Sequence, residues 1–148
     1  MSCLELSHKF QYSLIALLEI AKSYESGEAR QIREIAAIHN IPVRYLDQLL
    51  GTLRCGGLIQ SIRGSKGGYI LAREPKKITV LDVYRCIENV VTVNPTLDSN
   101  VESLNNNVVK DIWQEVTGAS LLVLQQYTLC DLCEKITNRR LTEIMYYI

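Results

Sequence analysis

Apolar residues recur every three or four positions in three stretches between residues 8 and 54, with polar residues between them. This spacing places apolar side chains on one side of an α-helix. Ser7 precedes the first stretch and is of a type that caps helices, whereas Gly27, Asn40 and Pro42 interrupt the pattern. The predicted helices cover about residues 8–23, 32–39 and 43–54.

The third predicted helix has one apolar side and one polar side. Its apolar side consists of Leu46, Leu49, Leu50 and Leu53. Its other faces carry Arg44, Tyr45, Asp47, Gln48 and Thr52. Such a helix packs on one side and displays varied chemistry on the other.

A β-hairpin with a basic tip is predicted directly after this helix. Residues 58–63 and 69–72 are strand-like, and the glycine-rich segment 64–68 between them is typical of a turn. Arg63 and Lys66 lie beside the turn glycines, which let a backbone approach other groups closely.

Two capping boxes predict helices in the second half of the chain. Thr79 with Asp82 begins a helix that reaches about Asn89, and Thr128 with Asp131 begins a short helix. An apolar, tyrosine-rich tail follows over residues 142–148.

Between these capping boxes, the pattern predicts a mobile loop to residue 107 and then a helix of about twenty residues that ends near Tyr127. A helix that long exceeds what the core of so small a chain requires. Its surplus apolar side suggests pairing with a second copy. The candidate dimerisation residues are Val109, Ile112, Trp113, Val116, Ala119 and Val123.

Composition is that of an ordinary globular protein, with 47% hydrophobic and 22% charged residues. The absence of a long apolar run or a signal sequence predicts no membrane partner and a cytoplasmic location, or the plastid stroma if the gene is organellar. Net charge is zero, but residues 30–85 hold ten Lys or Arg against four Asp or Glu, a net +6. This basic middle third, between acidic ends, favours a nucleic-acid partner.

Three helices followed by a glycine-tipped hairpin are the elements of a winged helix-turn-helix, within a mainly α fold. A helix fits the major groove, where Arg44 could pair with guanine and Gln48 with adenine, while Tyr45 could contact a phosphate or a thymine methyl group. Arg63 of the wing could enter the minor groove. The candidate DNA-binding residues are Gln31, Arg33, Arg44, Tyr45, Gln48, Arg54, Arg63, Ser65, Lys66, Gly67, Gly68 and Tyr69. A winged helix that binds protein instead is the alternative.

The expected organisation has three parts. Residues 1–91 form the winged helix-turn-helix DNA-binding domain, residues 92–107 a flexible loop, and residues 108–148 the dimerisation helix with its tail. No constellation of base, nucleophile or phosphate-binding loop suggests an enzyme or a small-molecule substrate.

Residues 41–73 resemble the winged-helix core of the Rrf2 family of transcriptional regulators, which includes IscR, NsrR, RirA and CymR. The motifs Tyr-Leu-acidic-Gln-Leu, Leu-Arg-x-x-Gly-Leu and Arg-Gly-x-x-Gly-Gly-Tyr occur in the expected order, and the resemblance extends over about residues 6–134. It implies a homodimer, most often a repressor, that is paired through the long helix and bound to palindromic double-stranded DNA. By the same resemblance Arg44, Tyr45 and Gln48 fall where the family reads base edges, and Arg63 where its wing enters the minor groove.

The chain departs from many relatives in its cofactor ligands. Those relatives hold an iron–sulfur cluster through three cysteines before the long helix, whereas residues 87–129 contain none here. Thiolates are the usual cluster ligands, and Gln11 lies where some relatives supply a carboxylate. The sequence therefore predicts no cluster, no other cofactor and no metal.

Cys130 and Cys133 form a C-x-x-C motif at a predicted helix start, where the helix dipole lowers thiol pKa values. One interpretation is a redox switch that gates DNA binding. The others are that Cys133 packs inward while Cys130 has no special role, or that the pair shares a metal with ligands from a second protomer.

Overall fold

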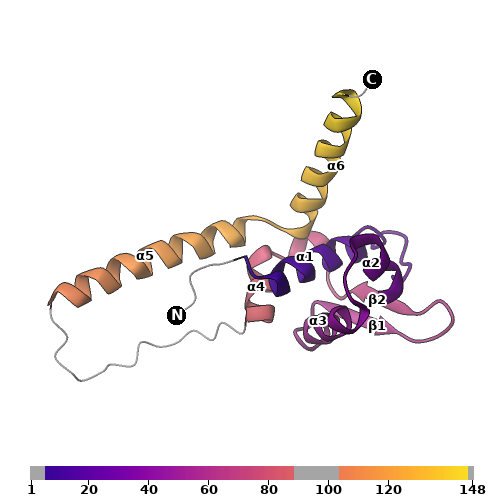
Figure 1. Cartoon of the computed structure of the whole chain (residues 1–148), viewed down its shortest axis with the longest axis horizontal. Coiled ribbons are helices and arrows are strands. Elements are labelled where there is room, and N and C mark those ends of the chain that lie inside the picture. Colours follow the sequence, from indigo (N-terminus) through magenta and orange to yellow (C-terminus); the bar gives the residue numbers. More distant parts are fainter. Residues whose placement is uncertain (1–5, 89–103, 147–148) are drawn as a thin grey trace.

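The computed structural model describes residues 6–88 and 104–146. Figure 1 shows a body of short helices with the two-stranded wing at one end and two longer helices that leave it in different directions. The structure therefore has the mainly α winged helix-turn-helix fold that the sequence predicts. The elements are α1 (His8–Ala21), α2 (Ile32–His39), α3 (Val43–Cys55), β1 (Ile59–Ile62), β2 (Gly68–Leu71), the 3-10 helix η1 (Pro75–Lys77), α4 (Val80–Glu88), α5 (Leu104–Gln126) and α6 (Leu129–Tyr146).

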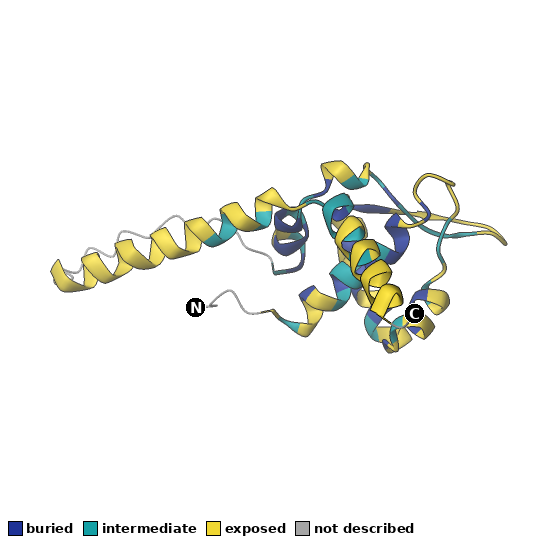
Figure 2. Ribbon diagram, turned by 90° about the horizontal axis from the view of Figure 1, so that it is seen from above, coloured by how far each residue is buried: buried dark blue, intermediate teal, exposed yellow. Residues whose placement is uncertain are grey.

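Helix α1 lies at the centre of the body. Ser7 caps its start by accepting a 3.1 Å hydrogen bond from the backbone N–H of Phe10. The helix packs against α3, α4, β2 and the start of α6. Its residues Ala16, Leu17 and Ile20 are at most 1% exposed. Figure 2 shows the buried residues gathered in this body, while the two long helices are mostly exposed.

The turn between α2 and α3 sets the orientation of α3. Asn40 ends α2 in the left-handed conformation, with φ of 54°, which asparagine tolerates better than most residues. Ile41 then enters the core at 3% exposure, and Pro42 precedes the first residue of α3. Because Ile41 and the leucines of α3 are buried together, the helix has a fixed rotation about its axis.

The wing is an antiparallel hairpin in which Ile59 pairs with Leu71 and Ile62 with Gly68. Arg30 pairs with Tyr69 of β2, which lies opposite Ser61, through backbone hydrogen bonds of 3.0 and 2.9 Å. Strand β2 of the wing is thereby attached to the segment that leads into α2.

The starts of α4 and α6 lie side by side. Thr79 and Thr128 form an isolated β-bridge, and the backbone N–H of Leu129 donates to the carbonyl of Ile78 at 2.9 Å. Both capping boxes form, since each threonine exchanges hydrogen bonds with its aspartate at 3.0 to 3.2 Å. Leu129 is fully buried, so the first turn of α6 belongs to the core of the body.

Two predictions for the second half of the chain need correction. Helix α5 begins at Leu104, so residues 104–107 of the expected loop are helical, and the rest of that loop lies outside the described residues. Helix α6 is not short but continues to Tyr146 through most of the expected tail. Residues 129–146 contain neither glycine nor proline, so nothing in this segment ends the helix.

Candidate nucleic-acid interface

Helix α3 separates its two sides as the sequence predicts. Leu46, Leu49, Leu50 and Leu53 are at most 1% exposed. Arg44 and Gln48 are exposed on the opposite side, together with Asp47 and Thr52. Residues four apart in a helix are neighbours on its surface, so the Arg44 guanidinium and the Gln48 amide emerge from successive turns of one face.

Tyr45 is less exposed than a residue displayed for DNA contact would be. It is half-buried, and its ring meets that of Tyr12 edge-on, with ring centroids 5.9 Å apart. This contact attaches the first turn of α3 to α1. The sequence places Tyr45 away from the leucine side, and the pattern within one helix does not reveal a ring contact from another helix.

The tip of the wing presents exposed Arg63, Ser65 and Lys66. Gly67 and Gly68, which precede the half-buried Tyr69, have a structural role. A Cβ at Gly67 would collide with the carbonyl oxygen of Ile62, and one at Gly68, which has φ of 154°, would lie 2.5 Å from the carbonyl oxygen of Arg30. Only glycine therefore fits where the wing closes and where it meets the body.

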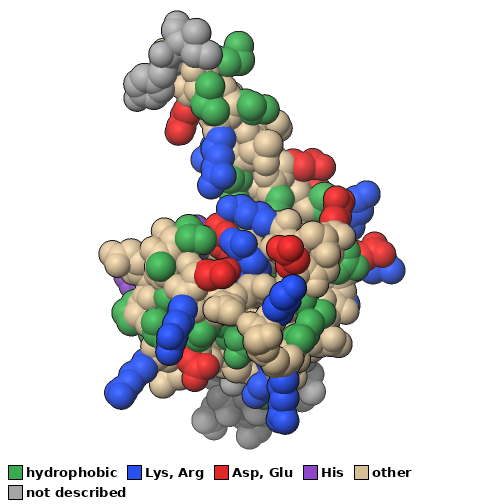
Figure 3. Space-filling model, turned by 90° about the vertical axis from the view of Figure 1, so that its right-hand side faces the viewer, with side chains coloured by type: hydrophobic (Ala, Val, Ile, Leu, Met, Phe, Trp, Pro, Cys, Tyr) green, Lys and Arg blue, Asp and Glu red, His purple; other side chains and the backbone are tan. Residues whose placement is uncertain are grey.

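The remaining predicted DNA-binding residues, Gln31, Arg33 and Arg54, are also exposed. Gln31 precedes α2, Arg33 lies in its first turn, and Arg54 is in the last turn of α3. Figure 3 views the molecule from the wing end, and Lys and Arg side chains project over this face with acidic side chains among them.

One buried carboxylate lies behind this face, and the sequence pattern did not reveal it. Glu19 of α1 has a side chain only 4% exposed. Its Oε1 lies 2.6 Å from Lys22 Nζ and 2.9 Å from His39 Nε2, and its Oε2 lies 3.1 Å from Arg30 Nη2. His39 ends α2 and Arg30 pairs with the wing, so one carboxylate holds both to α1. The available signal was an acidic residue next to Ile20 on the apolar side of α1.

The protonation of Glu19 follows from these partners. Burial alone would raise the pKa of this carboxyl, but hydrogen bonds and charges from Lys22 and His39 outweigh it and hold the pKa below its ordinary value. Glu19 is therefore an anion at neutral pH.

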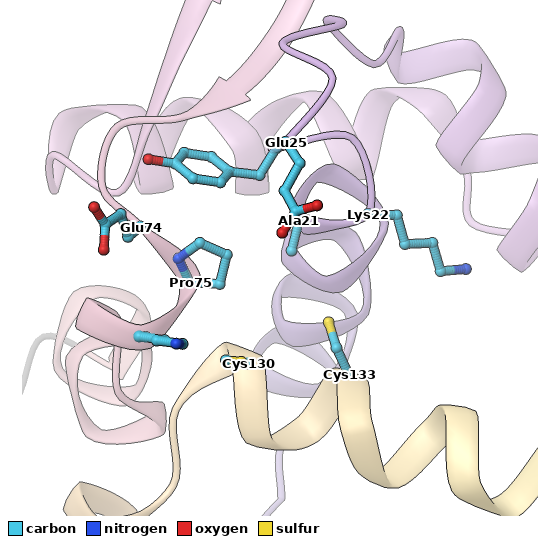
Figure 4. A pocket seen from close by; sticks show the side chains of 9 residues that line it. Ala21, Lys22, Glu25, Glu74, Pro75, Cys130 and Cys133 are labelled. Carbon is cyan, nitrogen blue, oxygen red and sulfur yellow. The ribbon is translucent and has the colours of Figure 1, made fainter.

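Cys130 and Cys133 line a cavity of about 410 Å³ between the end of α1, η1 and the start of α6 (Figure 4). Cys133 packs against the core, as one interpretation of the sequence expects. Burial raises the pKa of its thiol, which reverses the lowering expected from the helix start. Cys130 is half-buried, and its S–H donates to Glu134 Oε1 at 3.8 Å.

The described residues offer few side chains that could bind a metal ion together. Within residues 6–88 and 104–146 no group of three or more His, Cys, Asp or Glu side chains could hold a metal ion. The sequence has no cysteine between Cys86 and Cys130. Ligands of an iron–sulfur cluster are mainly thiolates, so the residues present do not fit such a group.

The predicted dimerisation side of α5 is uncovered in the single chain. No residue of this 23-residue helix is buried. Val109 is 66% exposed, Ile112 56%, Trp113 44%, Val116 48% and Val123 51%, and Ala119 is exposed as well. In the described ranges, no helix is long and apolar enough to span a membrane.

Comparison with known proteins gives one consistent result. Residues 6–135 match the family model Rrf2, described as an iron-dependent transcriptional regulator. The chain is 32% identical to the HTH-type transcriptional regulator CymR of Bacillus subtilis over 98% of its length and 100% of the relative's. It is 30% identical to the HTH-type transcriptional regulator IscR of Cereibacter sphaeroides, covering 87% of this chain and 86% of that one.

Comparison with solved structures gives the same family. The structure of CymR, the global cysteine regulator of B. subtilis, superimposes with a TM-score of 0.76 at 34% identity, covering 90% of this chain and 98% of that one. T. potens IscR superimposes with a TM-score of 0.73 at 33% identity, covering 90% and 88%. The chain therefore belongs to the Rrf2 family, and it is a DNA-binding transcriptional regulator and not an enzyme.

Proposed function

We propose that this regulator acts as a homodimer on a palindromic DNA site, with two α3 helices in major grooves and two wings against the flanking backbone, and without an iron–sulfur cluster. The observation that carries the proposal is the exposed face of α3 with Arg44 and Gln48, which has four buried leucines behind it and the wing beside it. The recognition face is thus presented on a rigid support.

The chemistry of the exposed side chains supports the proposed contacts with DNA. Arg63 and Lys66 are exposed at the wing tip, where phosphates or a narrow minor groove would meet them. The guanidinium of Arg44 and the amide of Gln48 have the donors and acceptors that pair with guanine and adenine edges. Asp47 lies between them on the same helix and would disfavour a phosphate at its own position.

The homodimer is supported by the uncovered side of α5. A helix of 23 residues is roughly 35 Å long, and along all of it no residue is buried within the chain. Exposed valine, isoleucine and tryptophan side chains along one helix mark an interaction surface. A second copy of the same helix would cover this side and bring two α3 helices to one duplex.

The absence of a cluster is supported by the ligands available. Cys130 and Cys133 are the two cysteines in the cavity beside α6, and thiol ligands are missing from the segment before α5. Anaerobic purification followed by an absorption spectrum and iron analysis tests this. Bound iron with a visible absorption band would contradict it.

Selection from random duplexes tests the function itself. We expect an enriched palindrome whose half-sites lie about one helical turn apart or a multiple of it. Light scattering should give the mass of a dimer. Enrichment of a single, non-repeated half-site, or a monomer at the concentration of DNA binding, would contradict the proposal.

A further inference from the structure

The cavity beside α6 exposes a pair of thiols to a space large enough for a small molecule. Figure 4 shows Cys130 and Cys133 on the α6 side of this cavity, with the sulfur of Cys133 directed toward α1. Ala21 at the end of α1, Lys22 directly after it and Pro75 of η1 line the other sides. The volume is about 410 Å³.

The spacing of the two cysteines suits a disulfide within the helix. They are the second and fifth residues of α6, and Cβ atoms three residues apart in a helix are about 5–6 Å from each other. A disulfide needs about 3.5–4.5 Å. Closing this gap takes a small local shift at the start of α6, where the N–H groups of Leu129, Asp131 and Leu132 donate to Ile78 and Thr128, which lie outside the helix.

The two thiols have different surroundings. Cys133 packs against the core beside α1, and burial raises its pKa. Cys130 is outside the core and bonds only weakly to Glu134, at 3.8 Å. Both thiols line the cavity, and Cys130 is the one that does not pack against the core.

The cavity is connected to the DNA-binding face by a short chain of contacts. Lys22 lines the cavity and pairs with Glu19, and Glu19 also holds Arg30. The backbone of Arg30 pairs with Tyr69 in β2 of the wing. A shift of Cys133 away from α1 would act on Lys22, the first member of this chain.

We propose that Cys130 and Cys133 are a modification site for small, water-soluble disulfide compounds, and that the resulting protein disulfide weakens DNA binding. The Cys130 thiolate attacks one sulfur of the compound, which forms a mixed disulfide and releases one thiolate. Cys133 then loses its proton, attacks the sulfur of Cys130 and releases the second thiolate. The protein loses two electrons and two protons, and the compound becomes two thiols.

This inference rests on the proposed function, because the consequence of the modification is read in DNA binding. Moving the Cys133 sulfur toward Cys130 takes it away from α1 and from the nearby charges of Lys22 and Glu19, and Glu19 is the residue that holds Arg30. We expect the affinity for the selected palindrome to fall about fivefold.

The experiment treats the full-length dimer with 2-hydroxyethyl disulfide in the absence of oxygen. Trypsin leaves Cys130 and Cys133 together on residues 111–135, while Cys3, Cys55 and Cys86 fall on three other peptides. We expect peptide 111–135 to lose two hydrogen atoms without gaining an adduct. Cys133→Ser should instead hold a mixed disulfide at Cys130. DNA affinity is measured on the same samples before treatment and after it.

A matched control is Cys130→Ala, which keeps the core packing of Cys133 and should bind DNA equally well with and without the reagent. A peptide 111–135 that stays reduced while other cysteines react would overturn the site. An intramolecular disulfide with unchanged DNA affinity would overturn the link to the wing. If the reduced protein binds no duplex, the proposed function fails, and the peptide masses still decide whether the pair reacts.

Discussion

Replacing Glu19 by Gln removes one buried charge and leaves its shape almost unchanged. In the wild type this carboxylate faces Lys22, Arg30 and His39, whose side chains are 42%, 27% and 27% exposed. Breaking a fully buried pair costs about 3–5 kcal/mol. Because water reaches all three partners, we expect a smaller loss of about 2 kcal/mol.

The expected loss corresponds to a fall in Tm of roughly 4–8 °C for a chain of this size. Thermal unfolding at pH 7, followed by circular dichroism at one fixed protein concentration, measures it, since dimer dissociation also shifts Tm. Glu28→Gln is the control, because Glu28 is exposed on the surface loop after α1. Its stability should change by no more than about 0.5 kcal/mol.

The difference between wild type and E19Q should also depend on pH. The folded-state pKa of Glu19 lies below its ordinary value, so the carboxylate stabilises the fold fully above its unfolded pKa, about 4.3. That stabilisation disappears as pH falls through the lower, folded-state pKa. The two proteins should therefore differ at pH 7 and converge in acid. Equal stability at pH 7, or a difference that grows in acid, would refute the reasoning.

Three further predictions concern the DNA face, the long helix and the wing. Arg44→Ala should weaken binding by about 1–3 kcal/mol and relax preference at one base pair, measured by competition among operator variants; uniform weakening at every sequence would contradict base reading. Ile112→Asp should shift the dimer toward monomer in light scattering, whereas Gln114→Ala should not; an unchanged mass would place the interface elsewhere. Gly67→Ala should destabilise the chain by about 1–3 kcal/mol because its Cβ meets backbone, whereas Gly51→Ala, with nothing within 4 Å, should raise stability by up to about 1 kcal/mol in thermal unfolding.

The sequence predicts the first three helices and the wing well because local rules decide them. Apolar spacing sets the buried side of α3, and Asn40 with Pro42 sets the turn before it. The extent of α6 escapes such rules, since an exposed helix shows no apolar periodicity toward a core. Its continuation to Tyr146 follows only from the absence of a residue that would end it.

Contacts between distant elements account for what the sequence does not reveal at the site. The Glu19 cluster joins α1 to residues 11 and 20 positions later, and no spacing rule relates them. Tyr45 meets Tyr12 across 33 positions in the same way. The exposed residues Arg44 and Gln48 could be predicted because their neighbours within one helix are enough to place them.

The bridge between Thr79 and Thr128 limits how the DNA-reading part of this protein can be reused. A fragment that stops after α4 lacks Leu129, which is fully buried among residues of the first 88. It also lacks the backbone partner of Ile78. A chimaera that transplants this winged helix onto another oligomeric scaffold must therefore bring the opening turn of α6 with it, even though α5 intervenes along the chain.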